Sequence, residues 1–164
     1  MTEKLFVENK GKDRETLTEY LEELFACKIV IIPWDTEEKC GHSDGMVRYV
    51  EPGHVVINDY GDIDEALRQK LLDALRPHFS KISELHYGDN ARKKSWAHIN
   101  FLRVGNTLFV PQMGIPSDAM AIEQMKDIYQ ECEIVPVEVD GIVKKGGALN
   151  CVSWNIKELR EVLS

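Results

Sequence analysis

The sequence lacks long apolar segments. Of its 164 residues, 43% are hydrophobic, yet no apolar run approaches the roughly 20 residues that a transmembrane helix requires. The opening Met-Thr-Glu-Lys also lacks the pattern that begins a signal peptide. We therefore expect a cytoplasmic protein with no membrane partner.

Positive charge is scarce as well. The chain has 20 Lys and Arg residues against 28 Asp and Glu residues, so its formal net charge is −8 at pH 7. The basic residues are scattered rather than gathered on one stripe, which argues against nucleic acid or an anionic membrane as a partner. A cationic small molecule is favoured instead.

Cysteines are few and irregularly spaced. Cys27, Cys40, Cys132 and Cys151 do not form the pattern of a disulfide framework, and a reducing compartment would keep them as thiols. Cys40 and His42 could begin a zinc site, but a structural site has four ligands and no second Cys/His pair with such spacing exists. We therefore expect no metal and no cofactor, and at least one thiol kept for its reactivity.

One order of elements is predicted twice along the chain. The first set comprises strands at 46–50 and 55–58, a helix capped by Asp62 with Ile63, Leu67, Leu71, Ala74 and Leu75 on its apolar face, and a strand at 81–86. The second set comprises strands at 99–104 and 107–111, a helix at 117–130 and a strand at 133–139. The turns at Gly53 and Gly105 lie about fifty residues apart, a period typical of repeated units.

The two ends of the chain look like incomplete units. The first supplies a strand at 29–32 and, before it, a helix whose apolar face is Leu17, Tyr20, Leu21, Leu24 and Phe25. Residues 148–164 predict a strand and a short helix. With no low-complexity linker between these pieces, we expect a single domain over 1–164, with full modules at about 46–87 and 98–139.

A thiol, an imidazole and a carboxylate could converge on one substrate. Cys151 ends a Gly-Gly-Ala-Leu-Asn-Cys run, whereas His42 and Asp44 lie more than a hundred residues upstream. Cysteine is a strong nucleophile once a nearby cation lowers its pKa, and protonated His42 is a candidate for that cation. The alternatives are a buried core cysteine and a local hydrogen bond within the His-Ser-Asp turn. The tryptophans Trp34, Trp96 and Trp154 are expected in the core or at an interface.

Three motifs in order carry a resemblance to a known family. They are GHSDGMVRYV at 41–50, INFL at 99–102 followed by Gly105-Asn106 and VPQ at 110–112, and GGALNC at 146–151. Over about residues 28–153 the chain resembles the C-terminal half of the agmatine deiminase and bacterial peptidylarginine deiminase family. The resemblance implies an α/β (α+β) fold, here a partial pentein-type propeller built from strand-strand-helix-strand modules.

The resemblance also implies roles for the candidate residues. Cys151 would attack the guanidinium carbon, His42 would move protons and Asp44 would bind the guanidinium nitrogens. Asn100 and Asn150 are further candidates for substrate binding, with the alternative that Asn100 is a strand residue that satisfies backbone groups. This chemistry is independently sensible. A planar cation suits a carboxylate, and ammonia leaves only after a general acid protonates it. The predicted function is hydrolysis of agmatine, arginine or a peptidylarginine side chain through a covalent thiouronium.

The sequence departs from the family in two respects. Members usually carry His where Asn150 stands, and their N-terminal half, which holds a further guanidinium-binding carboxylate, has no counterpart among these residues. Two interpretations therefore stay open: a guanidine-directed hydrolase, or an inactive remnant that acts as a binding or interaction module. Because a partial propeller leaves strand edges unpaired, we expect a homo-oligomer or a complex with a separate N-terminal half, pairing near 28–33 and 148–153.

Overall fold

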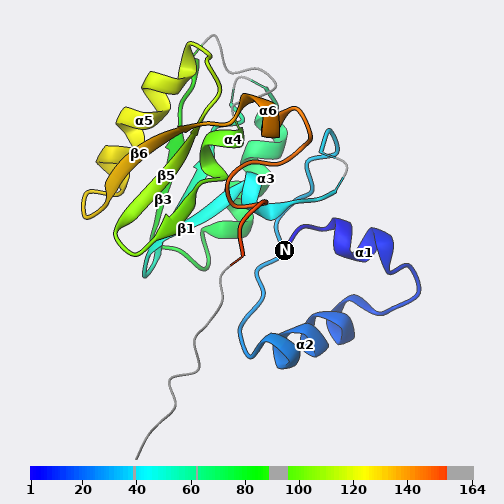
Figure 1. Cartoon of the computed structure of the whole chain (residues 1–164). Helices are drawn as coiled ribbons and strands as arrows, with labels where there is room; N and C mark the ends of the chain where they lie inside the picture. Colours follow the sequence, from blue (N-terminus) through cyan, green and yellow to red (C-terminus); the bar gives the residue numbers. More distant parts are fainter. Residues whose placement is uncertain (39, 62, 89–95, 155–164) are drawn as a thin grey trace, which may run out of the picture.

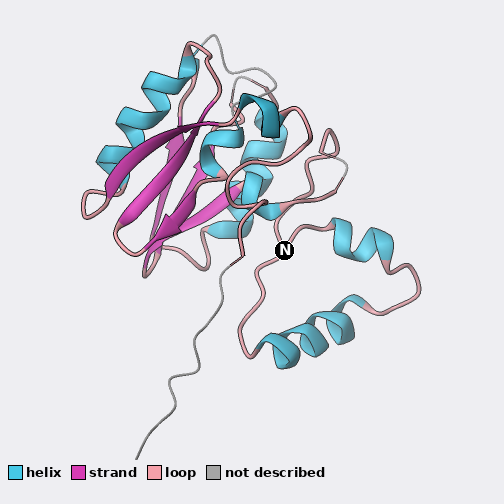
Figure 2. Ribbon diagram, viewed as in Figure 1, coloured by secondary structure: helices cyan, strands magenta, loops and turns pink. Residues whose placement is uncertain are grey.

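Two units with the same order of elements form the centre of the molecule. A computed structural model describes residues 1–38, 40–61, 63–88 and 96–154 (Figures 1 and 2). The first unit comprises β1 (Val47–Glu51), β2 (His54–Asn58), α3 (Glu65–Leu75) and β3 (Lys81–Leu85). The second comprises β4 (Leu102–Val104), β5 (Thr107–Gln112), α5 (Ser117–Ile128) and β6 (Glu133–Glu138). This is the order of elements that the sequence predicts.

Each unit contains one three-stranded sheet of the same topology. The central strand, β2 or β5, pairs antiparallel with the strand before it and parallel with the strand after the helix. All five residues of β2 are buried, as expected for a strand covered on both faces. The β1–β2 turn depends on Gly53, whose φ is +76° and whose added Cβ would lie 2.8 Å from Ser80 Oγ.

Helix α3 begins later than predicted. Its cap is Asp64, whose side chain accepts a hydrogen bond from the Leu67 N–H at 2.9 Å, and Asp62 lies outside the described residues. Ile63 precedes the helix and is 52% exposed, so its place on the apolar face was wrongly predicted. The buried side chains of the helix are Leu71, Leu72 and Leu75. Asp64 caps because its oxygen reaches the N–H three residues on.

The strand predicted at 99–104 is mostly not a strand. Residues Trp96–Ile99 form the single-turn helix α4, and only Leu102–Val104 pair as β4. A short apolar run is compatible with a buried helical turn as well as with a strand. Hydrophobic periodicity alone therefore does not distinguish helix from strand at this segment. The chain then bends at Asn100, whose N–H donates to the Ala97 carbonyl at 3.1 Å. This bend, rather than a strand, sets the direction of the Asn100 side chain.

The N-terminal segment also differs from the prediction. Residues 29–32 form no strand, and only Ile32 makes an isolated parallel bridge, with Thr2. Helix α1 (Lys4–Glu8) was not predicted, whereas α2 (Arg14–Phe25) was. Both lie to one side of the sheets (Figure 1). On the predicted apolar face of α2, Leu17 is buried while three side chains are more than half exposed: Tyr20, Leu24 and Phe25. Amphipathic spacing predicts the helix, but not what covers it.

The C-terminal segment carries a short helix and turns. Helix α6 (Asp140–Val143) follows β6, and residues 148–154 contain no strand, contrary to the prediction. The predicted final helix falls in 155–164, outside the described residues. Trp154 is 87% exposed, so it does not belong to the core of the chain. Gly146, just before this segment, has a φ of +89°, a conformation that favours glycine.

The largest apolar core joins the two units. Its members include Val56 and Leu85 from the first sheet and Leu108, Val110 and Met125 from the second unit. Full burial of such side chains contributes roughly 1.5–3 kcal/mol each. The units are therefore held in a fixed relation, and the ends of their elements can build a common site. Among the described residues, every helix is too short or too polar to traverse a bilayer.

Candidate functional site

One carboxylate oxygen gathers side chains from three distant segments. Asp44 lies in the 3₁₀ turn η1 (Ser43–Gly45), and its Oδ2 accepts hydrogen bonds from Asn100 Nδ2 at 2.7 Å and Asn150 Nδ2 at 2.6 Å. The Cys151 Sγ lies 3.6 Å from the same oxygen. Among the described residues, no hydrogen bond reaches Asp44 Oδ1. The structure thus brings together four of the five predicted site residues.

Asn100 fixes the position of the turn that carries Asn150 and Cys151. Its side chain is buried, its Oδ1 accepts the Cys151 N–H at 3.3 Å, and its backbone carbonyl accepts the Asn150 N–H at 3.1 Å. The η1 turn is fixed from the other side, because Asn58 Nδ2 donates to the Gly45 carbonyl at 2.7 Å. The site is therefore built on the buried ends of β2 and α4, which gives it a rigid base.

Cys151 lies in a turn rather than in the predicted apolar strand. It is exposed, which excludes the alternative of a buried core cysteine. A Cβ added at Gly147 would lie 3.2 Å from the Cys151 Cβ, so the Gly-Gly pair allows the close approach. The sulfur borders a shallow surface hollow lined by Gly141, Ile142, Lys145, Gly146, Gly147, Cys151 and Val152. Asp44 and His42 are not among these lining residues, so the hollow is not one shared cavity of the triad.

The sequence interpretation missed a cation beside this cluster. Arg48, in β1, donates to the Phe101 carbonyl at 3.1 Å and stacks over the Phe101 ring at 4.7 Å. Burial lowers the pKa of Arg48, while the charges of Asp44 and Cys151 oppose that effect. An arginine three residues after the His-Ser-Asp-Gly motif is the pattern that could have indicated it. Arg48 thus places a positive charge near Asp44 and Cys151.

His42 lies apart from the other candidates. Its imidazole Nδ1 is 3.8 Å from Glu38 Oε1, and the side chain is 48% exposed. The backbone N–H of His42 donates to Glu38 Oε2 at 2.8 Å. Within the described residues, no hydrogen bond or ion pair joins the ring to Asp44 or Cys151. Burial acts to raise the pKa of Glu38, but the N–H groups of His42 and Cys40 outweigh it and hold that pKa below its ordinary value.

The loop that carries His42 is anchored at several points. The Trp34 Nε1 donates to the Glu38 carbonyl at 2.8 Å, and Thr2 Oγ1 donates to the Gly41 carbonyl at 2.8 Å. Gly41 has a φ of +73°, and a Cβ there would lie 2.6 Å from the Lys4 Cδ. Only glycine fits such a position. The N-terminal residues therefore shape the loop before the catalytic candidates.

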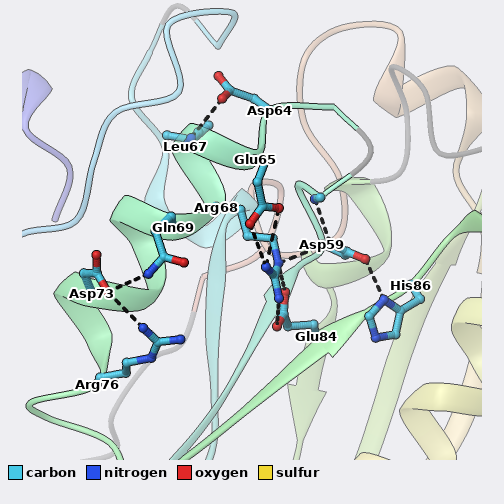
Figure 3. A network of polar contacts seen from close by, with 11 residues as sticks. Asp59, Asp64, Glu65, Leu67, Arg68, Gln69, Asp73, Arg76, Glu84 and His86 are labelled. Carbon is cyan, nitrogen blue, oxygen red and sulfur yellow. Dashed lines mark hydrogen bonds and ion pairs between the residues drawn. The ribbon is translucent and has the colours of Figure 1, made fainter.

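A second polar cluster lies within the first unit (Figure 3). The Arg68 guanidinium donates to both carboxylate oxygens of Glu84, at 2.6 and 2.7 Å, and to Glu65 at 3.1 Å. Its Nε is also 3.6 Å from Asp59 Oδ1, and Asp59 Oδ2 lies 2.5 Å from the His86 Nδ1. This cluster ties α3 to β3, and its carboxylates are already occupied by an internal cation.

Comparisons with known proteins identify relatives of this chain. The family model described as Porphyromonas-type peptidyl-arginine deiminase matches residues 1–156. A Vibrio parahaemolyticus protein named as a candidate agmatine deiminase is 24% identical across 73% of this chain and 42% of its own length. Another, from Mycoplasma capricolum, is 24% identical across 91% of this chain and 50% of its own length. The chain thus spans about half the length of these relatives.

Solved structures show the same fold. The agmatine deiminase of C. jejuni superposes with a TM-score of 0.72 at 19% identity, over 92% of this chain and 49% of that one. The agmatine deiminase of Enterococcus faecalis gives 0.72 at 20% identity, over 85% and 47%. The mixed α/β arrangement of the two units is therefore half of a fold that these enzymes share.

Proposed function

The chain belongs to the Porphyromonas-type peptidyl-arginine deiminase family, and from this membership we propose that it hydrolyses a guanidino group. One observation carries the proposal: Asp44 Oδ2 lies 3.6 Å from the Cys151 Sγ, although 107 residues separate them. A carboxylate that binds a guanidinium nitrogen there would hold the guanidinium carbon within reach of the sulfur. The net charge of −8 favours a cationic substrate.

Each residue of the cluster has a distinct proposed role. Asp44 binds the guanidinium through Oδ1, which no described residue occupies, while Asn100 and Asn150 hold Oδ2 and so act through Asp44. We assign these two amides to positioning the carboxylate that binds substrate. Arg48 supplies a positive charge that balances the negative charge of Asp44.

The proposed reaction has two halves. The Cys151 thiolate forms a C–S bond to the guanidinium carbon, a protonated His42 gives its proton to the departing nitrogen, and the C–N bond breaks to release ammonia. Water then attacks the thiouronium carbon, the imidazole takes a proton from the water, and the C–S bond breaks. The products are a ureido compound and the free thiolate. In this scheme the His42 ring turns from Glu38 toward Cys151 when substrate is bound.

We propose that a second copy or a separate chain contributes a carboxylate to the functional site. Arg68 shows that a guanidinium held within this protein contacts three carboxylates, whereas the Asp44 cluster offers one. A second copy or a separate N-terminal half would supply the further carboxylate. The edge-strand pairing expected near 28–33 and 148–153 has no basis in the described structure, because neither segment forms a strand. Sedimentation at micromolar concentration tests the contribution of a second chain: a strictly monomeric protein that is fully active would contradict it.

The activity is tested by release of ammonia and ureido product from agmatine, free arginine and an arginine peptide. We expect Cys151→Ser to lower turnover by several orders of magnitude, because the nucleophile is lost. Cys27→Ser is the matched control, since Cys27 is also exposed but lies outside the cluster. Equal product release by both variants would contradict a role of Cys151.

A second candidate function is favoured by the position of His42. Its ring faces Glu38 rather than Asp44 or Cys151, as in a module that binds a guanidinium without hydrolysing it. Under this alternative, agmatine perturbs the amide NMR signals of Asn100 and Asn150 while no ammonia appears. Product release that depends on both Cys151 and His42 would exclude it.

A further inference from the structure

We propose that Glu38, Cys40 and His42 form a binding site for a thiophilic divalent cation, with Zn²⁺ as the ion that fits best. Each residue offers one ligand atom, and these atoms lie within 4.8 Å of one another. A carboxylate oxygen, a sulfur and an imidazole nitrogen are the three ligand types that Zn²⁺ takes from proteins. Three protein ligands leave one coordination position open to water.

The backbone of the loop arranges this donor set. Glu38 Oε1 accepts the backbone N–H of Cys40 at 2.8 Å and Glu38 Oε2 accepts the backbone N–H of His42 at 2.8 Å, so the carboxylate is fixed against the backbone of both other residues. The His42 Nδ1 is 3.8 Å from Glu38 Oε1. Because Thr2 and Trp34 anchor the loop at Gly41 and Glu38, ligand binding need not order it from a random state.

The charge of the donor set suits zinc, and the donor atoms lie close enough to reach the ion after a small movement. Usual Zn–ligand bonds place tetrahedral donor atoms about 3.3–3.8 Å apart, so the group must contract by about 1 Å. Cys40 is exposed and His42 is half exposed, which leaves both side chains room to move. A carboxylate and a thiolate together carry two negative charges, which match the ion. Binding releases the Cys40 thiol proton to solvent.

The site has a consequence for catalysis that rests on the proposed function. The proposed reaction requires the His42 imidazole to turn from Glu38 and exchange protons at the substrate. A metal ion bound to that ring occupies its lone pair and keeps it beside Glu38. Zinc would therefore act as a reversible inhibitor through Cys40, a residue that the hydrolysis itself does not use.

The site is tested by titrating the whole protein with Co²⁺, which reports sulfur ligation by a charge-transfer absorption band. We expect a band in the parent protein, in Cys27→Ser and in Cys151→Ser, since neither cysteine belongs to the site. Cys40→Ser should lose the band, and calorimetry should show Zn²⁺ affinity at least on the order of 100-fold weaker, because a direct ligand is removed. A band that survives Cys40→Ser, or that vanishes in Cys151→Ser, would overturn the site.

Inhibition is measured separately, so the two proposals can fail independently. In the ammonia assay, Zn²⁺ should inhibit the parent and Cys27→Ser, whereas Cys40→Ser should keep its basal rate and resist inhibition. Glu38→Gln should resist as well. Binding without inhibition would overturn the regulatory link but leave the site. If no protein releases ammonia, the hydrolase proposal fails, and the Co²⁺ titration still decides the metal site.

Discussion

The two polar clusters of this protein use carboxylates in opposite ways. In the Arg68 cluster, one guanidinium is shared by Glu84, Glu65 and Asp59, and all of these side chains come from one structural unit. In the Asp44 cluster, one carboxylate is shared by two amides and approached by a sulfur, and its members come from three segments. The first cluster is a closed structural pair, whereas the second leaves an acceptor oxygen open to a ligand.

The difference indicates what a bound guanidinium needs in this fold. A carboxylate fork matches the parallel N–H groups of arginine, and Glu84 provides that fork for Arg68. The Oδ2 of Asp44 already accepts hydrogen bonds from Asn100 and Asn150, so only Oδ1 is available to bind a substrate. The Cys151 thiolate and a further carboxylate from a partner would supply the missing negative charge.

Among the changes that compare the two clusters, the largest expected effect follows from removing the charge at Asp44. Asp44→Asn keeps the shape of the side chain but loses the charge-assisted hydrogen bond to substrate, worth about 1.5–3 kcal/mol. We expect kcat/KM for agmatine to fall by roughly 10- to 150-fold or more. Asp73→Asn is the control, because Asp73 is an exposed carboxylate on α3. A similar loss in both variants would remove the distinction between the two clusters.

Breaking the closed cluster should affect stability rather than substrate binding. Arg68→Met removes the fork to Glu84 and leaves two carboxylates, Glu84 and Asp59, mostly shielded from water. We expect a loss of about 1.5–3 kcal/mol in urea denaturation. The matched control is Arg76→Met, since Arg76 forms an exposed pair with Asp73 that is worth under about 1 kcal/mol. Equal losses would show that burial does not distinguish these pairs.

A smaller effect is expected from one amide of the open cluster. Asn150→Ala removes one of two donors to Asp44 Oδ2 and should lower the free energy of unfolding by about 0.5–1.5 kcal/mol. It should also weaken substrate binding, because Asp44 is then less constrained. Asn106→Ala, in the exposed β4–β5 turn, serves as the control. An unchanged KM in Asn150→Ala would argue against the positioning role.

The smallest expected effect is a pH dependence within the Arg68 cluster. Burial acts to raise the pKa of Asp59, but hydrogen bonds from Gly61 and His86 and the charge of Arg68 outweigh it, so the pKa lies below its ordinary value of 3.8. A depressed pKa contributes stability above that ordinary value, and the contribution is lost as the pH falls through the folded-state pKa. Asp59→Asn should therefore lose less stability than the parent on acidification. Parallel denaturation series with identical slopes would contradict this.

The sequence predicts the order of elements in both units and four of the side chains that meet at Asp44 Oδ2 or carry it. Period-2 and period-3.6 patterns, together with turn residues such as Gly53 and Gly105, predict strands and helices from local physics. The predicted site comprised Asp44, Asn100, Asn150, Cys151 and His42, and the structure brings the first four together but not His42.

The contact partner of each functional side chain depends on the tertiary structure. The turn at Asn100, the cation at Arg48 and the pairing of His42 with Glu38 depend on contacts between segments far apart in the chain or on a loop without periodicity. The exposed face of α2 is a further case, because amphipathic spacing shows that a face is apolar but not what covers it. Local propensity specifies elements, whereas distances between functional atoms arise from how buried cores such as the one joining Val56 and Leu108 are packed.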